Sequence, residues 1–122
     1  MVGYVTLGTN DLPRATRFYD VLLESLGAKR LMELESFILW GTSFDDASLA
    51  ITKPFDGNAS TVGNGVMVAL QAQSKDAVDA LHKQALELGA QDEGAPGPRG
   101  DGFYAGYFRD LDGNKLNAFF LG

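Results

Sequence analysis

Cysteine is absent from this chain of 122 residues, which excludes disulfides, thiolate nucleophiles and thiolate metal sites together. No apolar run is long enough for a membrane-spanning helix. The opening MVGYVTLG lacks the basic and then apolar pattern of a secretory signal. These absences predict a cytoplasmic protein with no membrane partner.

Positive charge is also scarce, with 10 Lys and Arg residues against 16 Asp and Glu residues and a formal net charge of −6. Nucleic-acid binding draws most of its affinity from clustered Lys and Arg side chains, so we expect no nucleic-acid partner. The length and a hydrophobic content of 45% are typical of one globular domain with one sizeable core.

The first half of the chain carries the pattern of a strand, a helix and three further strands. The helix is expected to begin after an N-cap at Asn10 or Asp11 and to end at Gly27. Its apolar stripe recurs at helical spacing and comprises Ala15, Phe18, Tyr19, Leu22 and Leu26. The expected strands are Val2–Leu7, Lys29–Leu34, Ser36–Gly41 and Ala47–Lys53.

The second half starts the same order again. Its helix is expected to begin after an N-cap at Ser74 and to end at Gly89, and Gly94–Gly102 is expected to be a loop. We interpret Asp110–Asn114 as a hairpin turn; a calcium loop would need a bidentate glutamate where Leu121 stands. The expected strands are Val66–Gln73, Phe103–Arg109 and Lys115–Leu121.

Self-comparison indicates that the two halves are diverged copies. Tyr4-Val5-Thr6-Leu7 matches Met67-Val68-Ala69-Leu70, and Leu26-Gly27-Ala28 matches Leu88-Gly89-Ala90. The complete repetition of the element order is the stronger argument. We therefore expect one domain over residues 1–122, with module one at 1–58 and module two at 63–122.

The two ends of the chain carry its most recognisable stretches. The opening runs from Tyr4-Val5-Thr6-Leu7-Gly8 to Arg17-Phe18-Tyr19, and the closing stretch is Gly106-Tyr107-Phe108-Arg109-Asp110-Leu111-Asp112-Gly113-Asn114-Lys115-Leu116. Together they resemble the vicinal oxygen chelate superfamily of glyoxalases, bleomycin-resistance proteins and extradiol dioxygenases. The resemblance implies an α+β fold, in which two βαβββ modules form a cup-shaped, eight-stranded mixed sheet with both helices outside. It also implies a small ligand in the cup, commonly beside a divalent metal, and a homodimer.

The same resemblance places the metal ligands of the family at Tyr4, at Met67, at Asn117 and within Leu49–Ile51. None of these residues is a histidine or a carboxylate, and a divalent catalytic site normally holds three or more such groups. We therefore expect no metal and no other cofactor, and the metal-dependent chemistry of the family cannot simply be transferred.

Strand alternation predicts which side chains line the cup. If Val5 and Leu7 pack against the helix, Tyr4 and Thr6 point inward. Tyr104 and Tyr107 fall on opposite faces of their strand, so only one of them can point inward. The mixture of apolar walls and a few polar groups is typical of ligand pockets. The predicted ligand-binding residues are Tyr4, Thr6, Trp40, Met67, Gln71, Tyr107, Asn117 and Phe119.

Three functions remain open at this point. The first is metal-free binding of a small, partly aromatic or apolar molecule, by sequestration. The second is a lyase, isomerase or dioxygenase, metal-independent or with a displaced metal, in which Tyr4 is the acid–base group and Asn117 polarises the substrate. The third is a structural dimerisation module.

Two further residues have competing interpretations. His82, the only histidine, is expected to be a partly exposed helix residue rather than a catalytic base, because it has no predicted partner. Arg99 could close over an anionic ligand, although an exposed loop arginine is the commoner case.

Overall fold

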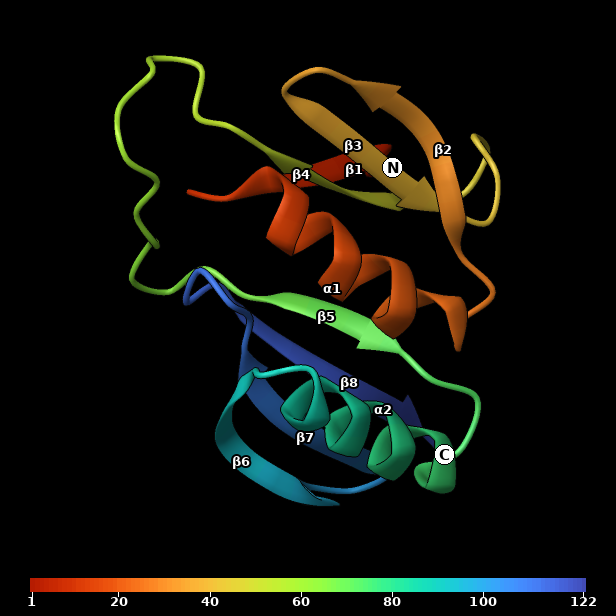
Figure 1. Ribbon diagram of the computed structural model, residues 1–122. Coiled ribbons are helices and arrows are strands. Elements are labelled where there is room, and N and C mark those ends of the chain that lie inside the picture. The colour runs from red at the N-terminus through yellow and green to blue at the C-terminus, as the bar shows by residue number, and fades with distance from the viewer. The chain divides into compact units, whose positions relative to one another are not determined.

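The computed structural model describes residues 1–122 and divides them into two units, Met1–Val62 and Gly63–Gly122. Each unit has one helix packed against one face of a four-stranded mixed sheet (Figure 1). The predicted α+β fold built from two βαβββ modules is therefore confirmed. That the two units together make one domain stays a prediction. No helix of the chain is long and apolar enough to cross a membrane.

The two units have the same topology. In both, the first strand pairs in parallel with the last, and the remaining neighbours are antiparallel, in the orders β1-β4-β3-β2 and β5-β8-β7-β6. The first unit comprises β1 (Tyr4–Gly8), α1 (Leu12–Glu24), β2 (Lys29–Leu34), β3 (Phe37–Gly41) and β4 (Ser48–Thr52). The second comprises β5 (Val68–Gln71), α2 (Lys75–Glu87), β6 (Gln91–Pro98), β7 (Phe103–Arg109) and β8 (Lys115–Leu121).

Side-chain caps fix the starts of both helices. Asp11 accepts a hydrogen bond from the backbone N–H of Arg14 at 3.1 Å, and Ser74 accepts one from Ala77 at 3.0 Å. After each helix the chain turns at a glycine with positive φ, Gly27 at 78° and Gly89 at 105°. The predicted helix starts are confirmed, with Asp11 as the first N-cap, whereas α1 ends at Glu24 and leaves Leu26 of the predicted stripe outside the helix.

The largest difference from the predicted strands concerns β6. Gly94–Gly102 was expected to be a loop, but its first part, up to Pro98, belongs to the edge strand β6. The pairing of β6 with β7 shifts register between Asp92 and Gly94 and again before Gly97. Proline is tolerated at a sheet edge, where its missing N–H is not needed, and glycine accommodates bulges.

A partly exposed polar link joins the helix of the first unit to its sheet. Asp20 of α1 accepts hydrogen bonds from Arg30 Nε of β2 and from Trp40 Nε1 of β3, both at 2.9 Å. The register places Arg30 opposite Trp40, so a single carboxylate holds two neighbouring strands against the helix. The hydrogen bonds from Arg30, the largest cause, and from Trp40 lower the pKa of Asp20 below its ordinary value, against the opposing effect of burial.

This link predicts a pH dependence of stability. A carboxylate whose pKa is lower in the folded than in the unfolded chain stabilises fully above its unfolded pKa, about 3.9. That contribution is lost as the pH falls through the folded pKa. We expect Asp20→Asn to cost about 1–2 kcal/mol at neutral pH and to flatten the loss of stability below about pH 4. Urea unfolding at several pH values measures both effects. Asp45→Asn, an exposed carboxylate with no side-chain partner, is the matched control and should leave the acid limb unchanged.

Candidate functional site

In the first unit, Tyr4 and Thr6 lie on the sheet face opposite α1. Tyr4 is 56% exposed and contacts the ring of Phe37 edge-on at 6.0 Å between centroids. Leu7 is buried, as expected for a residue on the helix side, whereas Val5 is 38% exposed. The Tyr4 hydroxyl has no hydrogen-bond partner.

Trp40 was predicted to bind ligand, and the structure contradicts this. Its indole lies on the helix side of β3, 1% exposed, with its ring centroid 5.7 Å from that of Tyr19 and its Nε1–H bonded to Asp20. Phe37, three residues earlier, lies on the opposite face of the strand, with Tyr4. Trp40 is therefore a core residue and cannot contact a ligand on the face of Tyr4.

In the second unit, four of the predicted ligand-binding residues share one face of the sheet. The register places Tyr107 opposite Asn117, and Gln71 opposite Phe119. Tyr104 is on the other face, because its hydroxyl donates to Asp79 of α2 at 2.6 Å. We call the face that carries Gln71, Tyr107, Asn117 and Phe119 the open face, since α2 packs on the other side (Figure 1). Met67 precedes β5, which begins two residues later than expected, and is 41% exposed.

Asn117 is the unusual residue of this face. It lies in the middle strand pair, with Tyr107 of β7 on one side and Ala69 of β5 on the other, and is 1% exposed. Its side-chain oxygen Oδ1 is buried and accepts no hydrogen bond. Leaving a buried polar atom unsatisfied costs about 1–3 kcal/mol, so such atoms in a native fold need an explanation. A bound ligand with a hydrogen-bond donor would supply one.

His82 corrects another expectation. It is buried rather than partly exposed, and its Nε2 lies 3.1 Å from Asp92 Oδ1 and 3.1 Å from the backbone oxygen of Tyr107. A backbone hydrogen bond from Gly94, followed by that from His82, lowers the pKa of Asp92. His82 thus joins α2 to β6 and β7 from the helix side. It supports the strand that carries Tyr107 without reaching the open face.

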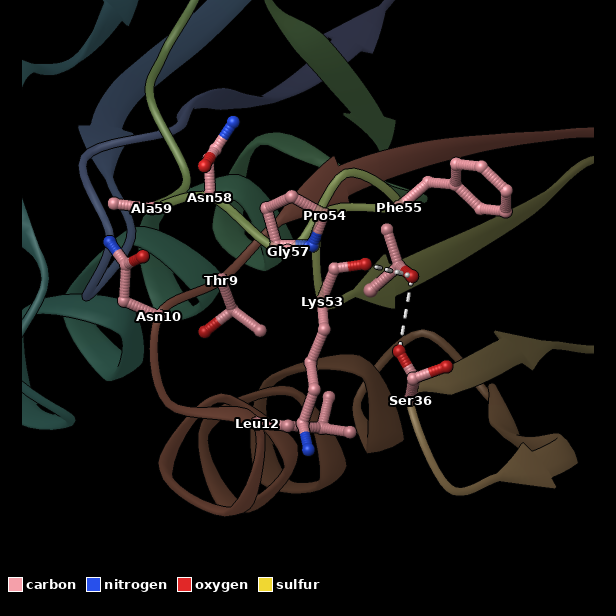
Figure 2. Close-up of a pocket in the computed structure, with 11 residues that line it drawn as sticks. Thr9, Asn10, Leu12, Ser36, Lys53, Pro54, Phe55, Gly57, Asn58 and Ala59 are labelled. Atoms are coloured by element: carbon pink, nitrogen blue, oxygen red, sulfur yellow. Dashed lines mark hydrogen bonds between the residues drawn. The ribbon is translucent and has the colours of Figure 1, made fainter.

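The largest pocket described in the first unit, of about 600 Å³, lies between the β1–α1 connection and the segment after β4, as Figure 2 shows. Three of its polar side chains are already engaged in hydrogen bonds. Asn10 exchanges two hydrogen bonds with the backbone of Ser60, and Thr9 Oγ1 accepts one from the backbone of Asp11. Thr52 Oγ1 donates to backbone oxygens. These bonds stabilise the chain connections, so the pocket offers a ligand less than the open face does. No sequence signal pointed to it.

The donor set does not fit a divalent metal. Tyr4, Met67 and Asn117, the positions implied by the resemblance, carry a phenol, a thioether and an amide. No group of three or more His, Asp or Glu side chains is arranged to hold an ion anywhere in the chain. A mechanism routed through a metal therefore has no support from the residues present.

Comparisons with known proteins agree on one family. Residues 1–118 match the family described as Glyoxalase/Bleomycin resistance protein/Dioxygenase superfamily. The crystal structure of a glyoxalase/bleomycin resistance protein from Albidiferax ferrireducens T118 is 36% identical, with a TM-score of 0.89, over 98% of this chain and 97% of that one. No functionally curated protein matches the chain.

More distant structures share the fold alone. A glyoxalase-related enzyme from Fulvimarina pelagi is 22% identical, with a TM-score of 0.76, over 98% of this chain and 87% of that one. A lactoylglutathione lyase from Agrobacterium tumefaciens is 19% identical, with a TM-score of 0.69, over 98% of this chain and 92% of that one. Because one fold hosts many activities, these likenesses assign no reaction.

Proposed function

The chain belongs to the Glyoxalase/Bleomycin resistance protein/Dioxygenase superfamily, and from this premise we propose that it binds a small, partly aromatic molecule on the open face of its second unit. Binding requires no divalent metal at the positions usual in the family. The protein acts by sequestration, and in keeping with the resemblance it works as a homodimer. The observation that carries the proposal is the buried Asn117 Oδ1 without a donor.

The surroundings of Asn117 suit such a ligand. The ring of Tyr107 stands opposite it, and Phe119, two residues along β8, stacks on Phe103 with centroids 5.6 Å apart. Ala69 on the other neighbouring strand is exposed, and its small side chain adds little bulk beside the amide. Aromatic walls with one oriented polar group are the usual make-up of a small-molecule site.

The catalytic alternative has less support. It needs Tyr4 as an acid–base group, and a general base or acid works when hydrogen-bonded partners tune and orient it. Tyr4 has one ring neighbour, Phe37, and no hydrogen-bond partner. No observation of the structure favours turnover over binding.

Asn117→Leu tests the proposal. Leucine keeps the approximate size of the side chain and removes the acceptor, so we expect aromatic ligands with a hydrogen-bond donor to bind at least about tenfold more weakly. 4-Hydroxybenzamide and 4-hydroxybenzoate are suitable probes, measured by calorimetry and by the rise in melting temperature that native-state binding produces. Since the variant loses no hydrogen bond, its unfolding free energy should equal or exceed that of the wild type.

Asn58→Leu, an exposed asparagine of the first unit, provides the matched control and should bind both probes normally. If the wild type and the Asn117→Leu variant bound both probes with equal affinity, the proposal would be wrong. The absence of binding by either probe to the wild type would also contradict it.

A further inference from the structure

Resting on the proposed function, we infer that the ligand of the open face is an organic oxyanion, a carboxylate or a phosphate on an aromatic group, whose charged end is held by Arg99 and Lys115. Both cations lie over the ring of Tyr107, the residue opposite Asn117. Two positively charged groups and one hydrogen-bond acceptor therefore lie around the same aromatic ring.

Arg99 is anchored, although it follows the end of β6 and is exposed. Its Nη2 donates to the backbone oxygen of Ala95 at 2.6 Å and its Nη1 to that of Pro98 at 3.4 Å, while Cζ lies 5.6 Å from the centre of the Tyr107 ring. A guanidinium has five N–H donors, so these two bonds leave others for a ligand. The planar fork matches the two oxygens of a carboxylate or phosphate.

Gly97 of β6 gives the guanidinium of Arg99 space next to the strand, whereas a side chain at Gly94 would only be in ordinary contact with it. A Cβ atom added at Gly97 would lie 3.0 Å from Nη1 of Arg99, and one at Gly94 would lie 3.5 Å from Nη2. The glycine content that suggested a loop thus lets the guanidinium lie close to the strand backbone beside Tyr107. An arginine held in this way loses less conformational entropy when it binds an anion.

Lys115 adds a second cation. Its Nζ lies 5.5 Å from the centre of the Tyr107 ring, and it forms no direct ion pair, although its charge helps to lower the pKa of Glu93. Arg109, its partner in the β7–β8 register, is on the same face but is paired with Glu93, whose pKa it lowers. Two cations, Arg99 and Lys115, therefore lie over Tyr107 in a chain whose net charge is −6. Neither cation forms a direct ion pair, so both can still contact the oxyanion of a ligand.

The neutral side chain of Asn117 is compatible with an anionic ligand. A carboxylate at this position would repel an oxyanion bound near Tyr107, whereas the neutral amide accepts a hydrogen bond without adding negative charge. The arrangement fits a molecule whose oxyanion meets Arg99 and Lys115, whose ring lies along Tyr107 and whose donor reaches Asn117 Oδ1. Such a ligand uses the two cations and the unpaired acceptor together.

Matched probes test the charge requirement. We expect 4-hydroxybenzoate to bind at least about tenfold more tightly than the neutral 4-hydroxybenzamide, which has the same ring and hydroxyl. The advantage should shrink as the salt concentration rises from about 0.05 to about 0.5 M, because salt screens exposed charges. 4-Hydroxyphenyl phosphate in place of the benzoate distinguishes a phosphate from a carboxylate ligand by relative affinity.

Arg99→Gln and Lys115→Gln should each remove most of the preference for the anion while leaving the affinity for the amide unchanged. Arg17→Gln and Lys29→Gln make the same charge change in the first unit and should preserve it. Equal binding of benzoate and benzamide that still depends on Asn117 would overturn this inference and leave the proposed function intact. Binding of neither probe would overturn the proposed function and the inference together.

Discussion

Alanine in place of Trp40 is expected to lower the free energy of unfolding by about 3–5 kcal/mol, the usual cost of deleting a large buried aromatic side chain. Trp40 is 1% exposed and packs on Tyr19, so its removal leaves a cavity between β3 and α1. The substitution also removes one of the donors to Asp20. Urea unfolding followed by circular dichroism measures the change, since the only tryptophan is lost as a fluorescent probe.

Trp40→Phe separates packing from hydrogen bonding. It keeps an aromatic ring and removes the Nε1 donor, so we expect a smaller loss of about 1–2 kcal/mol. Phe44→Ala, 70% exposed in the same unit, should change stability by less than about 0.5 kcal/mol. If Trp40 instead contacted ligand, its replacement would weaken binding and leave the urea midpoint where it was. A folded Trp40→Phe protein should bind the probes normally.

The helices and the repeat could be predicted because their signals are local. The caps at Asp11 and Ser74 and the stops at Gly27 and Gly89 act within one turn of the chain. The family could be recognised for the same reason, since its motifs are short stretches at the two ends of the chain, and the comparisons confirm it. These caps and glycine stops are enough to predict the order of the elements.

Strand β6 could not be predicted from its own residues, because its glycines and prolines are typical of loops. What makes Gln91–Pro98 a strand is its pairing with β7, the next strand along the chain, in a register interrupted by two irregularities that no alternating pattern in its residues reveals. The burial of His82 could not be predicted because its partners lie 10 and 25 residues further along the chain. Its burial depends on Asp92 and on the backbone of Tyr107, both of which belong to that strand pair.

The sequence predicts only some of the features of the open face. Alternation correctly predicts that residues two apart share a face, but it does not say which face meets the helix, and Trp40 fell on the helix side. The missing donor at Asn117 Oδ1 depends on all the surrounding side chains, so no sequence pattern could reveal it. The sequence predicts an exposed loop arginine at Arg99. Its hydrogen bonds to backbone oxygens of β6 could not be predicted, because β6 itself was not predicted as a strand.

Asp110→Ala is expected to cost about 3–5 kcal/mol and to weaken ligand binding as well. The turn between β7 and β8 is closed by Asp110, whose Oδ1 accepts from the backbone of Asp112 and of Asn114, both at 2.9 Å. Its Oδ2 accepts from Asn114 Nδ2 at 3.0 Å, and the residue is buried. Alanine leaves these donors without an acceptor. The prediction that Asp110–Asn114 is a hairpin turn is confirmed by the same bonds.

The link to binding is the strand register. The turn holds β7 and β8 so that Tyr107 stands opposite Asn117, and a slip of one residue would move each side chain of a strand to the other face. Asp110→Asn keeps Oδ1 but presents an N–H₂ group to Asn114 Nδ2, so an intermediate loss is expected. Asp101→Ala, an exposed carboxylate of the preceding loop, is the control. Urea unfolding and calorimetry with 4-hydroxybenzoate measure the two effects, and the same result for Asp110→Ala and Asp101→Ala would contradict the assigned role of this turn.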